Sequence, residues 1–96
     1  MTIEEIKQKI IPIAKEYDLP KVAVFGSAAV GKLTKNSDID FLIERSDKIS
    51  GIDFFGFCLA LEDALGKSVD VLTYKGIQNS VFKESILEDE VVIYEK

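Results

Sequence analysis

Two aspartates spaced one residue apart open an apolar run, and this feature constrains the fold of the chain more than any other. The run from Asp38 to Glu44 reads DIDFLIE, which is typical of a β-strand. Successive side chains of a strand point to opposite faces, so Asp38 and Asp40 share one face while Ile39 lies on the other. The sequence therefore predicts a strand that carries two carboxylates on the same side.

A shorter apolar run, VAVF at residues 22–25, precedes these aspartates. Its continuous apolar character predicts a central strand that is covered on both faces. Gly26 ends this strand, and Ser27 is expected to cap a short helix that begins with Ala28. Free backbone N–H groups at such a turn suit an anion. Gly26 and Ser27 are therefore a candidate phosphate site, with ten residues between Ser27 and Asp38.

The N-terminal residues 3–17 carry apolar side chains at helical intervals and predict an amphipathic helix. Thr2 and Glu5 have the spacing of a capping box at the start of this helix. Pro12 is expected to kink or split it, because a proline inside a helix lacks the N–H donor and its ring clashes with the preceding turn.

Two further helices and two further strands are expected after the aspartates. Ser50 is expected to cap a helix that runs to about Leu65 and ends at Gly66. This helix is apolar on most sides, so either it leaves a second apolar face for a partner or a second copy of the chain, or it is completely buried. The other elements are a strand at 68–74, a helix at 77–87 with Val81, Phe82 and Ile86 inward, and a peripheral strand at 91–94. The pattern predicts an α/β (α+β) fold with a mixed β-sheet flanked by helices.

Asp70 is a third carboxylate and lies in an otherwise apolar strand, where Val or Ile would be more stabilising. Acidic groups gathered in one buried place repel one another unless cations neutralise them. The chain has no histidine, so a metal ion held here would have oxygen ligands, as Mg²⁺ and Mn²⁺ prefer. We expect Asp38 and Asp40 to bridge two such ions about 3.5–4 Å apart, with Asp70 completing one coordination shell and acting as general base.

The composition restricts the classes of function. There are 12 basic and 17 acidic side chains, and the net charge of −5 argues against a protein that follows nucleic-acid phosphates. The single cysteine, Cys58, cannot form an internal disulfide, and there is no leader or long apolar span. We therefore expect a cytoplasmic protein without a membrane association. The 96 residues are enough for one domain, 1–96, with a single core.

The Gly-Ser pair, the ten-residue spacing and the Asp-x-Asp pair resemble the signature of the DNA polymerase β-like nucleotidyltransferases, over about residues 22–74. In size and order the chain is most similar to the minimal, single-domain (MNT) members. The resemblance implies their fold, with Gly26 and Ser27 as the phosphate-binding pair and Asp38, Asp40 and Asp70 as metal-binding carboxylates. It also implies an enzyme that transfers a nucleoside monophosphate from an NTP, often AMP from ATP, to an acceptor hydroxyl.

One position departs from this pattern, because family members commonly have arginine where the chain has Val30. Lys32 or Lys35 is a candidate replacement near the phosphates, although a solvated surface lysine is the simpler interpretation. Minimal members are often paired with a helical HEPN-type protein in toxin–antitoxin modules, where this partner can accept the nucleotide.

Three functions therefore stay open at this point. The first is a nucleotidyltransferase that acts on a partner protein. The second is an inactive antitoxin-like module that neutralises a HEPN partner by occupancy, which Val30 favours. The third is an enzyme that modifies nucleic-acid ends, which the acidic composition disfavours.

Overall fold

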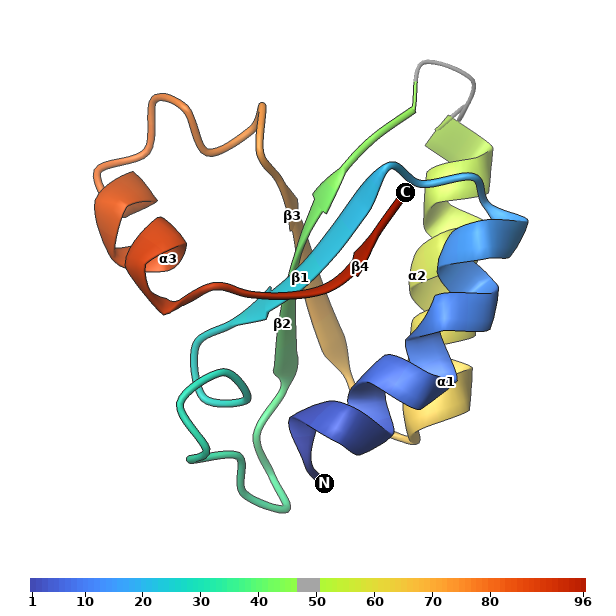
Figure 1. Ribbon diagram of the computed structural model, residues 1–96, viewed down its shortest axis with the longest axis horizontal. Coiled ribbons are helices and arrows are strands. Elements are labelled where there is room, and N and C mark those ends of the chain that lie inside the picture. The colour runs from blue at the N-terminus through green and yellow to red at the C-terminus, as the bar shows by residue number, and fades with distance from the viewer. Residues whose placement is uncertain (47–50) are drawn as a thin grey trace.

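The computed structural model describes residues 1–46 and 51–96, which form a mixed sheet flanked by helices (Figure 1). The elements in chain order are α1 (Ile3–Glu16), β1 (Lys21–Phe25), β2 (Ile39–Glu44), α2 (Gly51–Leu65), β3 (Val69–Thr73), α3 (Lys83–Asp89) and β4 (Val91–Glu95). The sheet has four strands in the order β3-β2-β1-β4. Strands β2 and β3 are parallel, whereas β1 is antiparallel to both β2 and β4. The predicted mixed sheet, with a peripheral last strand, is confirmed.

The two faces of the sheet are covered unequally. Helices α1 and α2 lie together on one side, and α3 lies on the other (Figure 1). The larger core cluster packs α1 and α2 against Val22, Val24, Phe41 and other buried residues. The smaller cluster, on the α3 side, centres on Ala23, Leu42 and Ile77. Strand alternation puts Asp40 on the side of Leu42, the less covered face.

Helix α1 begins with the predicted capping box. The Thr2 hydroxyl accepts a hydrogen bond from the Glu5 backbone N–H at 3.1 Å, and the Glu5 carboxylate accepts one from the Thr2 N–H at 3.3 Å. Pro12 is exposed and lies inside a helix that continues to Glu16, so the predicted split does not occur. Pro12 has no N–H to donate, so one helical hydrogen bond is missing. The packing of the core-facing side chains, which include the buried Ile10, stabilises the helix despite this loss.

Helix α2 ends as predicted, because Gly66 adopts a φ of +66° directly after Leu65. The predicted cap, Ser50, lies outside the described residues. Of the two alternatives for this helix, incomplete burial is correct: Phe55 and Leu59 are 65% and 51% exposed, while Phe57 is buried in the core. Among the described helices, none has the length and apolar character that a membrane span requires.

The predicted helix at 77–87 is wrong in its first half. Residues 74–79 form consecutive turns, and helix α3 begins only at Lys83. Side chains compete with backbone carbonyls for the N–H groups here. The Thr73 hydroxyl accepts a hydrogen bond from the Gly76 N–H, and the Ser80 hydroxyl accepts one from the Phe82 N–H. Val81 and Phe82, expected inward, are 90% and 67% exposed, whereas Ile86 packs against the smaller cluster as predicted.

Candidate functional site

Two of the three predicted carboxylates face each other across neighbouring strands. Asp40 lies in the second position of β2, and Asp70 in the second position of β3. The parallel pairing of these strands sets Asp40 opposite Asp70, and on its other side Asp40 pairs with Phe25 at the end of β1. The register therefore brings Asp40 and Asp70 together with the turn that follows β1.

The electrostatics of Asp40 reflect this crowding. The pKa of Asp40 is raised, first by partial burial, then by the charges of Asp70 and Asp38, and also by a hydrogen bond with the Asp70 side chain. A raised carboxyl pKa is the expected response to burial and to neighbouring negative charge. The prediction of a buried acid cluster is wrong, however, since Asp38 and Asp70 are exposed and Asp40 is only half-buried. The less covered face of the sheet leaves them accessible to solvent.

Asp38 lies one residue before β2 rather than within it. Within residues 1–46 and 51–96, no three acidic or cysteine side chains converge as a complete metal-binding group. The residues nevertheless suit a hard divalent cation, because the donors are all carboxylate oxygens and Asp40 and Asp70 occupy directly paired positions of neighbouring strands. The metal-binding roles of Asp38, Asp40 and Asp70 stay predictions.

Gly26 lies so close to the Asp40 side chain that a side chain at position 26 would force the carboxylate to move. Its φ is +66°, and a Cβ atom built on it would be 2.5 Å from Oδ2 of Asp40. Real Cβ atoms essentially never come so near another heavy atom. The Gly-Ser pair and the Asp-x-Asp pair, well separated in sequence, therefore meet at this contact.

The predicted short helix after Ser27 is not formed. Residues 26–31 form turns, in which the Gly26 carbonyl accepts from the Ala29 and Val30 N–H groups at 3.1 and 3.2 Å. Gly31 then adopts a φ of +74°, which ends the turn before a helix can propagate. Ser27 is half-buried, and its carbonyl accepts from the Lys32 N–H at 2.8 Å.

The cation expected near the phosphates is less well defined. Val30, where the resemblance leads us to expect an arginine, is 50% exposed. Lys32 and Lys35 are both exposed on the segment between β1 and β2. A phosphate-binding role for Lys32 stays a prediction.

Lys67 is a residue that the sequence interpretation missed. Its ammonium group donates to the backbone carbonyls of Thr34, Lys35 and Ser37 at 2.9, 3.0 and 3.3 Å. Ser37 directly precedes Asp38, so Lys67 contacts the segment that leads into the candidate site. A lysine between a helix and a strand has no sequence signal that distinguishes it from a solvated charge.

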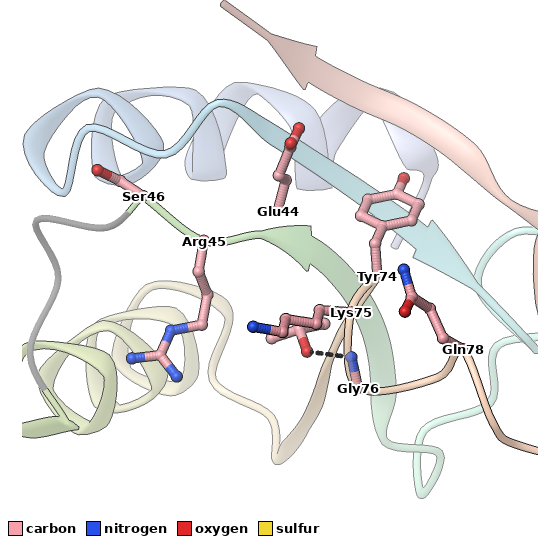
Figure 2. A pocket seen from close by; sticks show the side chains of 8 residues that line it. Glu44, Arg45, Ser46, Tyr74, Lys75, Gly76 and Gln78 are labelled. Carbon is pink, nitrogen blue, oxygen red and sulfur yellow. Dashed lines mark hydrogen bonds between the residues drawn. The ribbon is translucent and has the colours of Figure 1, made fainter.

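A hollow of about 740 Å³ lies at the opposite end of β2 and β3 (Figure 2). Its lining comes from residues around the carboxyl ends of these strands: Glu44, Arg45, Ser46, Thr73, Tyr74, Lys75, Gly76 and Gln78. Tyr74 donates a hydrogen bond to Glu90 at 2.8 Å, and its pKa is raised by burial and by this bond. Glu44 follows Asp40 by four positions in β2, which is about 13 Å along a strand. The hollow is therefore separate from the carboxylates.

Known proteins resemble this chain over nearly all of its residues. The family model "Polymerase beta, Nucleotidyltransferase" matches residues 8–96. A protein of Methanocaldococcus jannaschii, named as a protein adenylyltransferase, is 42% identical over 91 residues, which cover 95% of this chain and 97% of the relative. The match thus includes nearly the whole length of both proteins.

Solved structures of lower identity share the fold. A toxin–antitoxin structure with AMP-PNP has a TM-score of 0.78 at 23% identity, covering 94% of this chain and 73% of that chain. A chain from the complex of a tri-AMPylated Shewanella oneidensis HEPN toxin with an MNT antitoxin has a TM-score of 0.71 at 19% identity, covering 97% and 72%. With the matched family model and the close relative, these findings show that the chain belongs to the polymerase β nucleotidyltransferase family.

Proposed function

We propose that this protein is a Mg²⁺-dependent nucleotidyltransferase that transfers AMP from ATP to a hydroxyl group on a partner protein. The observation that carries this proposal is the pairing of Asp40 with Asp70 in parallel register, directly beside Gly26. The relative at 42% identity, named as a protein adenylyltransferase, supports AMP as the transferred group and a protein as the acceptor.

The chain's own residues supply most of the proposed mechanism. Asp38, Asp40 and Asp70 would hold Mg²⁺, which when bound polarises the phosphate and acidifies the acceptor hydroxyl. Gly26 leaves room for Asp40, and backbone N–H groups of the turn at Ser27 would hold the phosphates that are not transferred, with Lys32 as the nearby cation. Asp70 accepts the proton of the acceptor hydroxyl. The acceptor oxygen forms a bond to the α-phosphorus as the bond to the bridging oxygen breaks, and pyrophosphate leaves.

The proposed acceptor is a small helical protein of the HEPN type, with which this chain forms a toxin–antitoxin pair. Support comes from the solved complex of a tri-AMPylated HEPN toxin with an MNT antitoxin, whose fold this chain shares. The exposed apolar pair Phe55 and Leu59 on α2 offers a contact surface for this partner, or for a homodimer through residues 52–65. We propose the cytoplasm as its location, where ATP and Mg²⁺ are available.

A second candidate function is neutralisation of the partner by binding alone. Its specific support is Val30, an exposed aliphatic side chain at the position of the expected arginine. A cation at that position would stabilise the negative charge on the phosphates in the transition state. With valine there instead, we expect a slower enzyme or an inactive one.

Incubation with α-labelled ATP, Mg²⁺ and the protein encoded by the neighbouring gene separates these functions. We expect label on the partner with the wild-type chain, and a loss of at least about 10²-fold with Asp38→Ala, Asp40→Asn or Asp70→Asn. Asp63→Asn on α2, an exposed acid away from the site, is the matched control and should leave transfer unchanged. Tight partner binding without any label transfer would refute the enzyme and support the binding module.

A further inference from the structure

Lys67 occupies the short connection between α2 and β3, three residues before Asp70. An ammonium group has three N–H donors and no acceptor. Three backbone carbonyls, of Thr34, Lys35 and Ser37, lie within 2.9–3.3 Å of the Lys67 Nζ. Each N–H thus has an available partner in one turn of the chain.

That turn is itself closed by side chains. The Thr34 backbone N–H donates to the Ser37 hydroxyl at 3.1 Å, and the Thr34 and Ser37 hydroxyls are 2.7 Å apart. The Ser37 backbone N–H donates a hydrogen bond to the Thr34 carbonyl at 3.1 Å. Because these bonds are local, they give the turn its shape but do not attach it to the sheet. Lys67 supplies an attachment to the start of β3.

Asp38 is bounded by two such attachments. On its N-terminal side the Ser37 carbonyl accepts from Lys67, and on its C-terminal side the Ile39 N–H donates to the Ser68 carbonyl at 3.1 Å. Residues 67 and 68 therefore hold both neighbours of Asp38, which is exposed and lies outside the strand. The same two residues lead directly into the strand that carries Asp70.

We propose that Lys67 is a positioning residue that fixes Asp38 relative to Asp70 and thereby sets the affinity of the carboxylates for a divalent cation. This inference rests on the proposed function, because it assigns Lys67 to the same metal-binding carboxylates. Residues that orient metal ligands without touching the metal commonly change its affinity when they are replaced. Lys67→Met keeps the length of the side chain and removes all three donors.

The test uses binding of Mn²⁺ alone, followed by electron paramagnetic resonance, and amide hydrogen exchange of residues 34–39. We expect Lys67→Met to weaken Mn²⁺ binding by about 10-fold, since loss of outer-shell partners typically costs about 10–100-fold in affinity. We also expect faster amide exchange at Ser37 and Ile39. Lys67→Arg retains donors and should recover at least half of the loss. Lys9→Met, an exposed lysine on α1, should match the wild type and controls for lost charge.

Unchanged Mn²⁺ affinity in a folded Lys67→Met protein with faster exchange would overturn the inference, because Lys67 would then serve stability alone. If that variant does not fold, Ser37→Ala opens the same turn while retaining Lys67, and it should weaken Mn²⁺ binding by a smaller factor; no weakening would overturn the inference. Failure of the proposed function looks different: the wild-type chain itself would bind no Mn²⁺.

Discussion

At the scale of single residues, the contact between Gly26 and Asp40 permits a paired test. Gly26 and Gly31 both have positive φ, +66° and +74°, but a Cβ atom meets Asp40 only at Gly26 and meets nothing within 4 Å at Gly31. We expect Gly26→Ala and Gly31→Ala each to lower the free energy of unfolding by about 1–2 kcal/mol, the cost of left-handed backbone in a residue with a Cβ.

Only Gly26→Ala should also displace the Asp40 carboxylate, and a displacement of about 1 Å can cost about 10²-fold in rate. Urea denaturation measures the stability of both variants, and label transfer measures their activity. Equal activity of the two alanine variants would show that the close approach of Gly26 to Asp40 has no role in catalysis.

The crowding of carboxylates predicts that Asp40 lowers stability in the absence of metal. Its pKa is raised in the folded state by burial and by Asp70 and Asp38. The stability that protonated Asp40 contributes is fully present below the pKa of Asp40 in the unfolded chain, and it is lost as the pH rises through the pKa of Asp40 in the folded protein. At pH 7 the ionised carboxylate therefore weakens the fold.

Asp40→Asn should therefore melt higher than the wild type at pH 7 without divalent ions. Solvent screening limits the gain to no more than about 1 kcal/mol, or about 4–8 °C for a domain of this size. Differential scanning calorimetry should show the gap shrink as the pH approaches the ordinary carboxyl value of 3.8. Asp63→Asn should show no such gain, and an Asp40→Asn protein less stable at pH 7 would contradict the argument.

At the scale of elements, the start of α1 depends on the reciprocal bonds between Thr2 and Glu5. Thr2→Ala removes the hydroxyl that accepts from the Glu5 N–H, and such losses cost about 0.5–2 kcal/mol. We expect Thr2→Ala to lower the unfolding free energy by about 1 kcal/mol in urea denaturation. Thr2→Ser keeps the acceptor and should stay close to the wild type. Equal losses in both variants would assign the effect to the threonine methyl group instead.

The elements that could be predicted from sequence are those with strong local patterns. The apolar runs of β1 and β2, the capping box and Gly66 each indicate a structure from neighbouring residues alone. Alternation correctly assigned Asp40 to the same face of the sheet as Leu42. The helix at 77–82 failed because its apolar spacing is helical, while the bond from the Gly76 N–H to Thr73 favours turns.

The candidate site was predictable in composition but not in geometry. No local sequence pattern indicates that β2 and β3 pair in the register that sets Asp40 beside Asp70, because register depends on how the whole sheet packs. The contact of Lys67 with Thr34 joins residues 33 positions apart, so no local pattern indicates it. The burial of the acids was overestimated because α3 covers much less of its face than α1 and α2 cover of theirs.

At the scale of the whole molecule, the site and the exposed face of α2 belong to opposite sides of the sheet. Helix α2 packs with the larger cluster on one side of the sheet, and α3 lies on the other side (Figure 1). Strand alternation puts Asp40 on the α3 side, together with Leu42 of the smaller cluster. Phe55 and Leu59 are one helical turn apart and exposed, so they form one apolar surface. A partner bound to this surface would leave the carboxylates open to ATP and to an acceptor chain that reaches around the sheet.

Replacing both residues, Phe55→Ser with Leu59→Ser, therefore tests partner binding separately from folding. Because the side chains are exposed, the unfolding free energy should change by no more than about 0.5 kcal/mol. The affinity for the helical partner should fall by at least about tenfold, since burying one such side chain contributes about 1.5–3 kcal/mol and each 1.4 kcal/mol is about tenfold.

Sedimentation velocity of the chain alone and with its partner distinguishes a lost homodimer from a lost heteromeric complex. The matched control is Val81→Ser with Phe82→Ser, a second exposed apolar pair, next to α3. If the control pair weakens the complex and the α2 pair does not, the partner binds on the same side as the carboxylates. In that arrangement the acceptor hydroxyl would approach Asp70 directly, without an extended segment to carry it around the sheet.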